Sequence, residues 1–243
     1  MGLLKDIGTL FDLVVNPEEY ADKGKIGERF AYRELKDEYL KKQIFRNLYI
    51  KRADGKYTEI DLATVGRGAL IVYESKNYSG WIFGNDSDDN WMQTLSNGKK
   101  QKFYSPIRQN STHIEALREY LAGYPLEYHS IIVFSERCTL KNVSHSTPNT
   151  YVIKRNELVR TVRQIRKKAI QTLSKDQLEE VLSLLSKVQR PDEEVIEQHI
   201  EDVKEMLNTC PRCGGELVER TAKATGKQFL GCKSFPKCRY VRN

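Results

Sequence analysis

The sequence contains no apolar run long enough to cross a lipid bilayer. Its first residues also lack the basic and then apolar pattern of a secretory signal peptide. From these two absences we expect a cytoplasmic protein with no membrane partner. A calcium loop is missing as well, because the acidic stretch 85–90 lacks the spaced ligands and the closing glutamate of an EF-hand. We expect an exposed turn there.

Cysteine is scarce over most of the chain, and Cys138 is the only one before position 210. We expect this side chain to be buried and inert. The other four cysteines form two pairs in the tail, Cys210-x2-Cys213 and Cys232-x5-Cys238, separated by 18 residues. In a cytosolic chain, four clustered cysteines favour a closed structural zinc site over disulfides. The disulfide alternative remains open at this point.

Composition indicates a soluble globular chain of 243 residues, with 39% hydrophobic and 30% charged residues. This length suffices to bury a core, as one large domain or two unequal ones. The net charge is +7, and +6 of it lies from position 208 onward, where eight lysines and arginines oppose two glutamates. A near-neutral body with a basic tail indicates a polyanion partner held by the tail. A tail kept only for solubility is the weaker alternative.

One stretch, residues 69–76, joins a hydrophobic strand to charged residues. Its first five residues are apolar and β-prone, which predicts a strand buried on both faces. Side chains alternate along a strand, so Glu74 and Lys76 point to the same side. The preceding strand, residues 58–65, carries Asp61 and is linked through the short turn 66–68. We expect Asp61 within about one position of Glu74, with the register left open.

Two carboxylates side by side at the end of a hydrophobic strand repel each other and are costly to desolvate. A divalent cation between Asp61 and Glu74 would remove that cost, and Lys76 beside them could hold or polarise a water. The alternative is an ordinary Glu–Lys pair on an exposed strand end, which is the commoner meaning of so short a motif.

The remaining pattern predicts an α/β fold with a mixed sheet flanked by helices. Glu28 lies near the start of a predicted helix, where a carboxylate suits the helix dipole in any protein. Gln109 and His113 share one face of another helix, and such a pair usually lies at the surface. Helices are expected over 2–15, 25–42, 107–122, 156–170, 174–188 and 191–207, strands over 44–50, 58–65, 69–76, 77–84, 91–95, 99–104, 128–135 and 151–153, and a loop over 135–150.

Two basic segments leave alternatives open. The hairpin 91–104 places Lys99, Lys100 and Lys102 among Phe103 and Tyr104. Such a mixture can line a nucleic-acid groove or belong to a solvated hairpin. The basic helix 156–170 could contact phosphates, although a solvated face is the favoured interpretation.

Several of these residues together resemble the nuclease-related domain (NERD), a branch of the PD-(D/E)xK nuclease superfamily. The resemblance covers roughly residues 22–135 and implies a restriction-endonuclease-like fold. The proline of the superfamily motif is absent, because Ile60 precedes Asp61. The residues that carry the resemblance are Glu28, Asp61, Glu74-Ser75-Lys76 and Gln109.

The resemblance also implies a role for each residue. Asp61, Glu74 and the backbone carbonyl of Ser75 would bind Mg²⁺ or Mn²⁺, the cations that hard oxygen ligands suit. Lys76 would position the attacking water or steady the phosphate charge. Glu28 matches the helix-borne acid of the family, and Gln109 matches its second-helix glutamine.

The tail resembles the C4 zinc ribbon at the end of bacterial type I topoisomerases, on the stretches 210–215, 229–232 and 235–240. That resemblance implies DNA binding, mainly to single strands, while a ribbon for protein interaction remains an alternative. Aromatic rings in the tail could stack on bases. The candidate DNA contacts are Arg212, Lys227, Phe229, Lys233, Phe235, Lys237, Arg239 and Tyr240.

We therefore expect an N-terminal amphipathic helix (1–21), a nuclease-like domain (22–155), a helical connector (156–207) and a zinc ribbon (208–243). The predicted function is Mg²⁺-dependent hydrolysis of phosphodiester bonds, with DNA as the expected substrate. The alternative is a non-catalytic DNA-binding module on an inactive nuclease fold. An RNA-directed nuclease is a third and weaker interpretation, because the ribbon type points to DNA.

Overall fold

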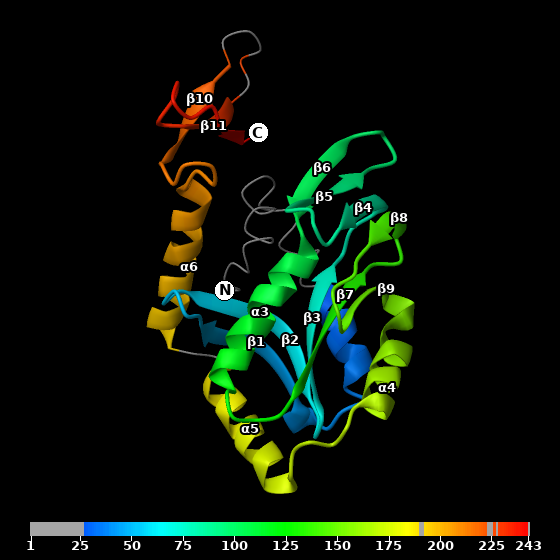
Figure 1. The fold of residues 1–243 in the computed structure, drawn as a ribbon. Coiled ribbons are helices and arrows are strands. Elements are labelled where there is room, and N and C mark those ends of the chain that lie inside the picture. The colour runs from blue at the N-terminus through cyan, green and yellow to red at the C-terminus, as the bar shows by residue number, and fades with distance from the viewer. Residues whose placement is uncertain (1–26, 190–191, 223–225, 227, 243) are drawn as a thin grey trace. The chain divides into compact units, whose positions relative to one another are not determined.

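The computed structural model describes residues 27–189, 192–222, 226 and 228–242 (Figure 1). The chain forms two compact units, Met1–His199 and Ile200–Asn243. The expected helix over residues 1–21 lies outside the described residues, as does Lys227. In the described part of the chain, no helix is both long and apolar enough to cross a membrane.

A five-stranded mixed sheet forms the centre of the first unit, in the order β1-β2-β3-β7-β9. The first three strands are antiparallel, whereas β3, β7 and β9 run parallel. This arrangement confirms the mixed sheet of the expected α/β class. The strands are β1 (Ile44–Lys51), β2 (Tyr57–Val65), β3 (Ala69–Lys76), β7 (Glu127–Phe134) and β9 (Thr150–Lys154).

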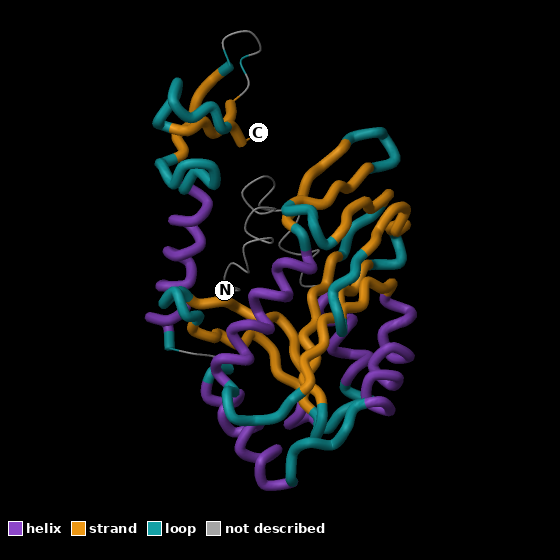
Figure 2. Tube along the Cα trace, in the orientation of Figure 1, coloured by secondary structure: helices purple, strands orange, loops and turns teal. Residues whose placement is uncertain are grey.

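Helices cover both faces of this sheet (Figure 2). On one face, α3 (Pro106–Tyr120) and α5 (Lys175–Lys187) pack into a core with Leu70 and Val72 of β3. On the other face, the helix 27–35 and α4 (Leu158–Lys168) pack against Ile71 and Tyr73. Because its residues face both cores in turn, β3 is apolar at every position before Glu74.

A second, four-stranded sheet follows β3 directly, in the order β6-β5-β4-β8. Its inner face packs on Ile132 and Phe134 of β7. Glycine at position 84 allows this packing, because an added Cβ would lie 2.3 Å from the Trp91 ring. The strands are β4 (Gly80–Asn85), β5 (Asn90–Thr94), β6 (Lys100–Tyr104) and β8 (Cys138–Ser144).

Some predicted elements differ from the structure. The expected loop 135–150 is wrong, because it contains β8, an edge strand that pairs with β4. Most side chains of this edge strand are at least partly exposed, so it has few apolar residues and no recognisable strand pattern. The helix expected over 25–42 ends at residue 35, and a short 3₁₀ helix, η1 (Lys41–Gln43), leads into β1.

The segment expected to be a helical connector packs closely on the body. After a second 3₁₀ helix, η2 (Arg155–Glu157), both α4 and α5 contribute buried side chains to the two cores. The capping box of α5 is confirmed, since Ser174 Oγ accepts from the Gln177 amide at 3.1 Å. The domain boundaries themselves remain a prediction.

The second unit contains most of α6 (Glu193–Asn208) and a small antiparallel sheet. Its core is small, with Leu217 and three of the four tail cysteines buried together. The strands are β10 (Leu217–Thr221), β11 (Gln228–Cys232) and β12 (Val241–Arg242).

Candidate metal centres

The pairing of β2 with β3 brings Asp61 and Glu74 to neighbouring positions. Leu62 and Tyr73 form the last pair of this ladder, and Asp61 and Glu74 are the next residues on the two strands. Both side chains are almost inaccessible, at 7% and 2% exposure. The register that the sequence left open therefore sets the two buried acidic residues at neighbouring positions on adjacent strands.

The side-chain alternation of β2 breaks at Asp61. Ile60 packs in the core with α3, whereas Leu62 packs in the core on the other face. Asn47 lies opposite Asp61 in the register between Arg46 and Leu48, and it has a φ of 54°. Asparagine tolerates this left-handed backbone better than most residues. A local twist of both strands thus lies at the candidate acid.

Lys76 joins Glu74 to helix α3. Its Nζ lies 2.9 Å from Glu74 Oε1 and donates to Gln109 Oε1 at 3.1 Å. All three side chains are buried. Since Glu74 and Lys76 are two apart on β3, the contact fits the predicted strand geometry. The ordinary pair on an exposed strand end does not describe these residues.

His113 belongs to the same cluster, although nothing in the sequence indicated that it lies near Glu74. The expected surface position of Gln109 and His113 is wrong, because both are buried. The His113 Nδ1 lies 2.8 Å from Thr58 Oγ1, and its Nε2 lies 4.0 Å from Glu74 Oε2. The i, i+4 spacing predicts that Gln109 and His113 share one face of the helix. It does not predict which strand that face packs against.

The start of the helix 27–35 lies against the end of β3. An added Cβ at Gly27 would lie only 2.6 Å from Ser75 Oγ, so the Gly27 backbone packs directly against the Ser75 side chain. Glu28, the next residue, is buried. The structure thus places the helix-borne acid near the same strand end as Glu74.

Negative charge predominates around this cluster. Glu28, Glu59, Asp61 and Glu74 are buried, whereas Lys76 is the one buried lysine or arginine in the part of the chain that the structure describes. Burial, together with the nearby carboxylates of Glu59 and Asp61, raises the pKa of Tyr49. Such a surplus of buried carboxylates fits a divalent hard cation. Asp61, Glu74 and the Ser75 carbonyl are the groups that could hold it.

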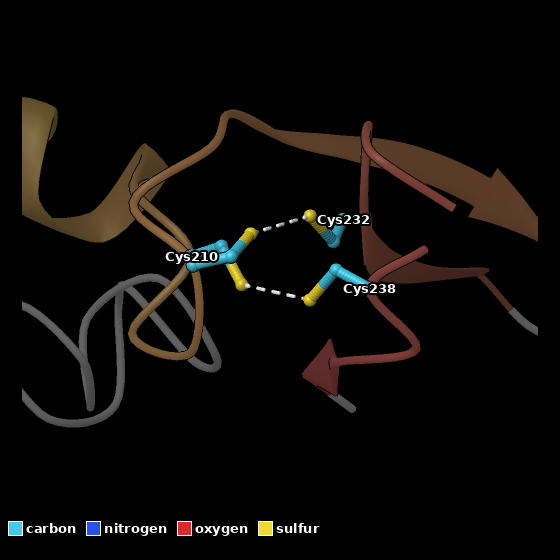
Figure 3. Close-up of side chains that lie close together, drawn as sticks. Cys210, Cys232 and Cys238 are labelled. Carbon is cyan, nitrogen blue, oxygen red and sulfur yellow. Dashed lines mark hydrogen bonds between the residues drawn. The ribbon is translucent and has the colours of Figure 1, made fainter. Parts of the chain in front are cut away.

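The second centre consists of the four tail cysteines (Figure 3). Cys210 Sγ lies 3.7 Å from Cys238 Sγ, and Cys213 Sγ lies 3.4 Å from Cys232 Sγ. All four are free thiols, so the disulfide alternative does not hold. A tetrahedron of sulfurs about 2.3 Å from a central zinc has edges of about 3.8 Å. The cluster therefore fits a closed structural Zn²⁺ site.

This cysteine cluster is also the one group of three or more His, Cys, Asp or Glu residues, among those described, whose ligand atoms all lie within 4.8 Å of one another. Asp61 and Glu74 thus do not form such a group of three with Glu28 or His113.

Comparison with known families gives one match in each of the two units. Residues 23–135 match the family model described as the nuclease-related domain, and residues 207–243 match that of the topoisomerase DNA binding C4 zinc finger. Residues 23–135 are a nuclease-related domain, and residues 207–243 are a topoisomerase-type zinc ribbon. Both resemblances noted in the sequence are thereby confirmed.

Individual relatives fall into the same two groups. An uncharacterized protein of Bacillus anthracis is 28% identical over 179 residues, which cover 73% of this chain and 82% of that protein. DNA topoisomerase 1 of Archaeoglobus fulgidus is 50% identical over 36 residues, and that of Pyrococcus horikoshii is 48% identical over 33 residues. These matches cover only 5% of each topoisomerase. No solved structure matches the chain.

A hollow of about 190 Å³ lies on the surface of the zinc ribbon. Three of the expected aromatic contacts line it, together with Arg239 and with Arg220, which the sequence analysis did not single out. The Arg220 guanidinium lies 5.6 Å from the centre of the Phe235 ring. Arg212 and Lys237 are exposed, and Lys233 pairs with Glu216 at 2.7 Å. The three aromatic residues are Phe229, Phe235 and Tyr240.

Proposed function

We propose that this protein is a metal-dependent nuclease that hydrolyses phosphodiester bonds of DNA and holds its substrate partly through the zinc ribbon. The observation that supports the proposal most strongly is the buried contact chain from Glu74 through Lys76 to Gln109, beside Asp61. These side-chain types suit phosphoryl chemistry, in which a charged transition state needs cationic and hydrogen-bonding groups.

In this proposal Asp61, Glu74 and the Ser75 carbonyl hold Mg²⁺ or Mn²⁺. When bound, such an ion neutralises phosphate charge and lowers the pKa of a coordinated water. Lys76 donates hydrogen bonds to the attacking water or to a phosphate oxygen. Gln109 accepts from Lys76 at 3.1 Å and so directs the ammonium toward the strand end. Glu28, near Ser75, would accept a proton or orient the water.

The zinc ribbon supplies DNA affinity in this proposal. The curated proteins that share this ribbon include DNA topoisomerases, and its family description names DNA binding. The aromatic and arginine-lined hollow offers stacking surfaces and positive charge, which single-stranded nucleic acid requires.

The test is a cleavage assay of the full chain on supercoiled, linear duplex and single-stranded DNA, with Mg²⁺ or Mn²⁺ added or withheld. Withholding the ion is preferable to chelation, because a chelator could also extract zinc. We expect Asp61→Asn and Lys76→Ala each to lower the rate by at least about 100-fold, since each removes a group that acts on the transition state.

Asp54→Asn is the matched control, because Asp54 lies in the exposed β1–β2 turn and pairs with Arg52. Its cleavage rate should equal that of the wild type. A wild-type chain that binds DNA in a ribbon-dependent manner but never cuts any substrate would contradict the enzyme. The non-catalytic DNA-binding module would then replace it.

A further inference from the structure

We infer that the outer face of the four-stranded sheet β6-β5-β4-β8 is a second binding surface, for single-stranded DNA. The inference rests on the proposed function for the identity of the polyanion, and it concerns a surface apart from both metal centres.

The two faces of this sheet differ sharply. The inner face carries Ile82, Trp91 and Phe103, which are buried in one hydrophobic cluster. The outer face carries Trp81, with 51% of its surface exposed. This large aromatic side chain lies outside the buried cluster, and its exposed surface is available to a ligand.

Strand pairing aligns lysines with this tryptophan. Trp81 pairs with Thr94, and Thr94 pairs with Lys100, so the three side chains form one row across β4, β5 and β6. Lys102 lies two residues further along β6 and thus on the same face. From the other side, Lys141 of β8 places its Nζ 5.3 Å from the centre of the Trp81 ring. The tryptophan is flanked by positive charge on both sides.

No negative charge opposes these lysines within the sheet. None of the four strands contains an aspartate or a glutamate. The nearest acidic run is the β4–β5 turn, where the Asp86 carboxylate accepts hydrogen bonds from Ser146 and Thr147. These hydrogen bonds, of which the one from the Ser146 amide has the largest effect, lower the pKa of Asp86 to about 2. The charge of Asp86 is therefore stabilised by Ser146 and Thr147.

The aromatic ring decides between single and double strands. In a duplex the base faces are stacked on one another, whereas an unpaired base can stack on an exposed indole while lysines contact the flanking phosphates. Lys100 and Lys102 thus favour the nucleic-acid interpretation of this hairpin over a merely solvated one. The interleaved Phe103 does not, because it faces the core.

The position of the sheet suits a nuclease substrate. β4 begins only four residues after Lys76, and β4, β5, β6 and β8 gather beyond the end of β3 (Figure 1). The sheet is therefore adjacent in the fold to the end of β3, which carries Glu74 and Lys76.

Tryptophan fluorescence isolates this surface from the zinc ribbon. The chain has two tryptophans, Trp81 and Trp91, and both lie in this sheet. Trp91 is 1% exposed and stacks on Phe134 with ring centroids 6.1 Å apart. Quenching on addition of a ligand therefore reports on Trp81.

The experiment titrates full-length Asp61→Asn protein, which should not cut, with a 12-nucleotide oligodeoxythymidylate in the absence of Mg²⁺. We expect saturable quenching that is absent in Trp81→Phe and persists in Phe235→Ala, where the ribbon is altered. By fluorescence anisotropy of a labelled oligonucleotide, Trp81→Ala should bind about 5- to 100-fold more weakly.

Salt dependence tests the lysines. Each phosphate contact on a single strand contributes about 0.7 to the slope of log Kd against log salt. Replacing Lys100, Lys102 and Lys141 together by glutamine should therefore reduce that slope by about 2. The matched control replaces three exposed lysines elsewhere, Lys36, Lys175 and Lys187, and should leave that slope unchanged.

Unquenched Trp81 fluorescence at an oligonucleotide concentration that saturates the ribbon would overturn the inference. An equal loss of slope in both triple variants would also overturn it, because the effect would then be one of net charge. Neither result depends on cleavage, so a chain without nuclease activity can still pass or fail this test.

Discussion

At the scale of single residues, His113 makes a contact with Glu74 that the proposed nuclease mechanism does not require. It lies between Thr58 on β2 and Glu74 on β3, and Asp61 follows Thr58 by three residues on β2. A residue that fixes a metal-ligating carboxylate from behind is typical of metal centres, and its loss usually costs metal affinity. We therefore interpret His113 as a positioning residue for Glu74.

We expect His113→Ala to weaken Mn²⁺ binding by about 10- to 100-fold, because Glu74 loses a neighbour that orients it. Titration calorimetry of the zinc-loaded protein measures this affinity without any substrate. His145→Ala serves as the control, since His145 is exposed and lies on the β8–β9 connection. Equal Mn²⁺ affinity in His113→Ala and the wild type would leave His113 with a packing role only.

At the scale of elements, the small sheet depends on the fit between β4 and β5. The Trp91 indole occupies the space that a side chain at position 84 would need. Its Nε1 also donates to the Asn85 carbonyl at 2.9 Å, so the ring is held in place by a hydrogen bond as well as by packing. A ring fixed in this way cannot move aside cheaply.

Gly84→Ala should therefore destabilise the protein by about 1–3 kcal/mol, through overpacking against Trp91. Urea unfolding followed by tryptophan fluorescence measures the change. Gly66→Ala is the matched control, because the nearest atom to its added Cβ lies at an ordinary 3.7 Å. If Gly84→Ala were as stable as Gly66→Ala, the packing of β4 on Trp91 would not be as tight as the structure indicates.

At the scale of the whole molecule, the two units differ in what stabilises them. The first has two large apolar cores on the faces of a five-stranded sheet. The core of the second consists of Leu217 and buried cysteines, with Leu230 and Tyr240 packed against it. A core this small does not stabilise a fold without a metal or disulfides.

Removal of zinc should therefore unfold β10, β11 and β12 and leave the first unit folded. Hydrogen exchange followed by mass spectrometry would show fast exchange over β10 and β11 and unchanged protection over β3 and β7. Cys232→Ser should have the same effect, whereas Cys138→Ala should retain one zinc per chain, because Cys138 lies apart from the cluster in the small sheet. Protected β10 and β11 amides in the zinc-free chain would contradict this prediction.

Features that depend on a few neighbouring residues were predictable from the sequence alone. The apolar run of β3, the shared side of Glu74 and Lys76, the capping box of α5 and the cysteine spacings all follow from local backbone geometry and side-chain chemistry. The order of buried strands and amphipathic helices was likewise sufficient for the mixed α/β class. The family resemblances then implied a chemical role for residues that their sequence pattern had already singled out.

Contacts between distant segments became evident only in the folded chain. The fold set the register of Asp61 against Glu74, placed the His113 face of α3 over Thr58, which is 55 residues away, and gave β8 its partner in β4. It also separated Trp81 from Phe103 on opposite faces of one sheet. Period and propensity describe a segment alone, whereas strand pairing and burial depend on contacts between segments, and these contacts formed both the candidate site and the second surface.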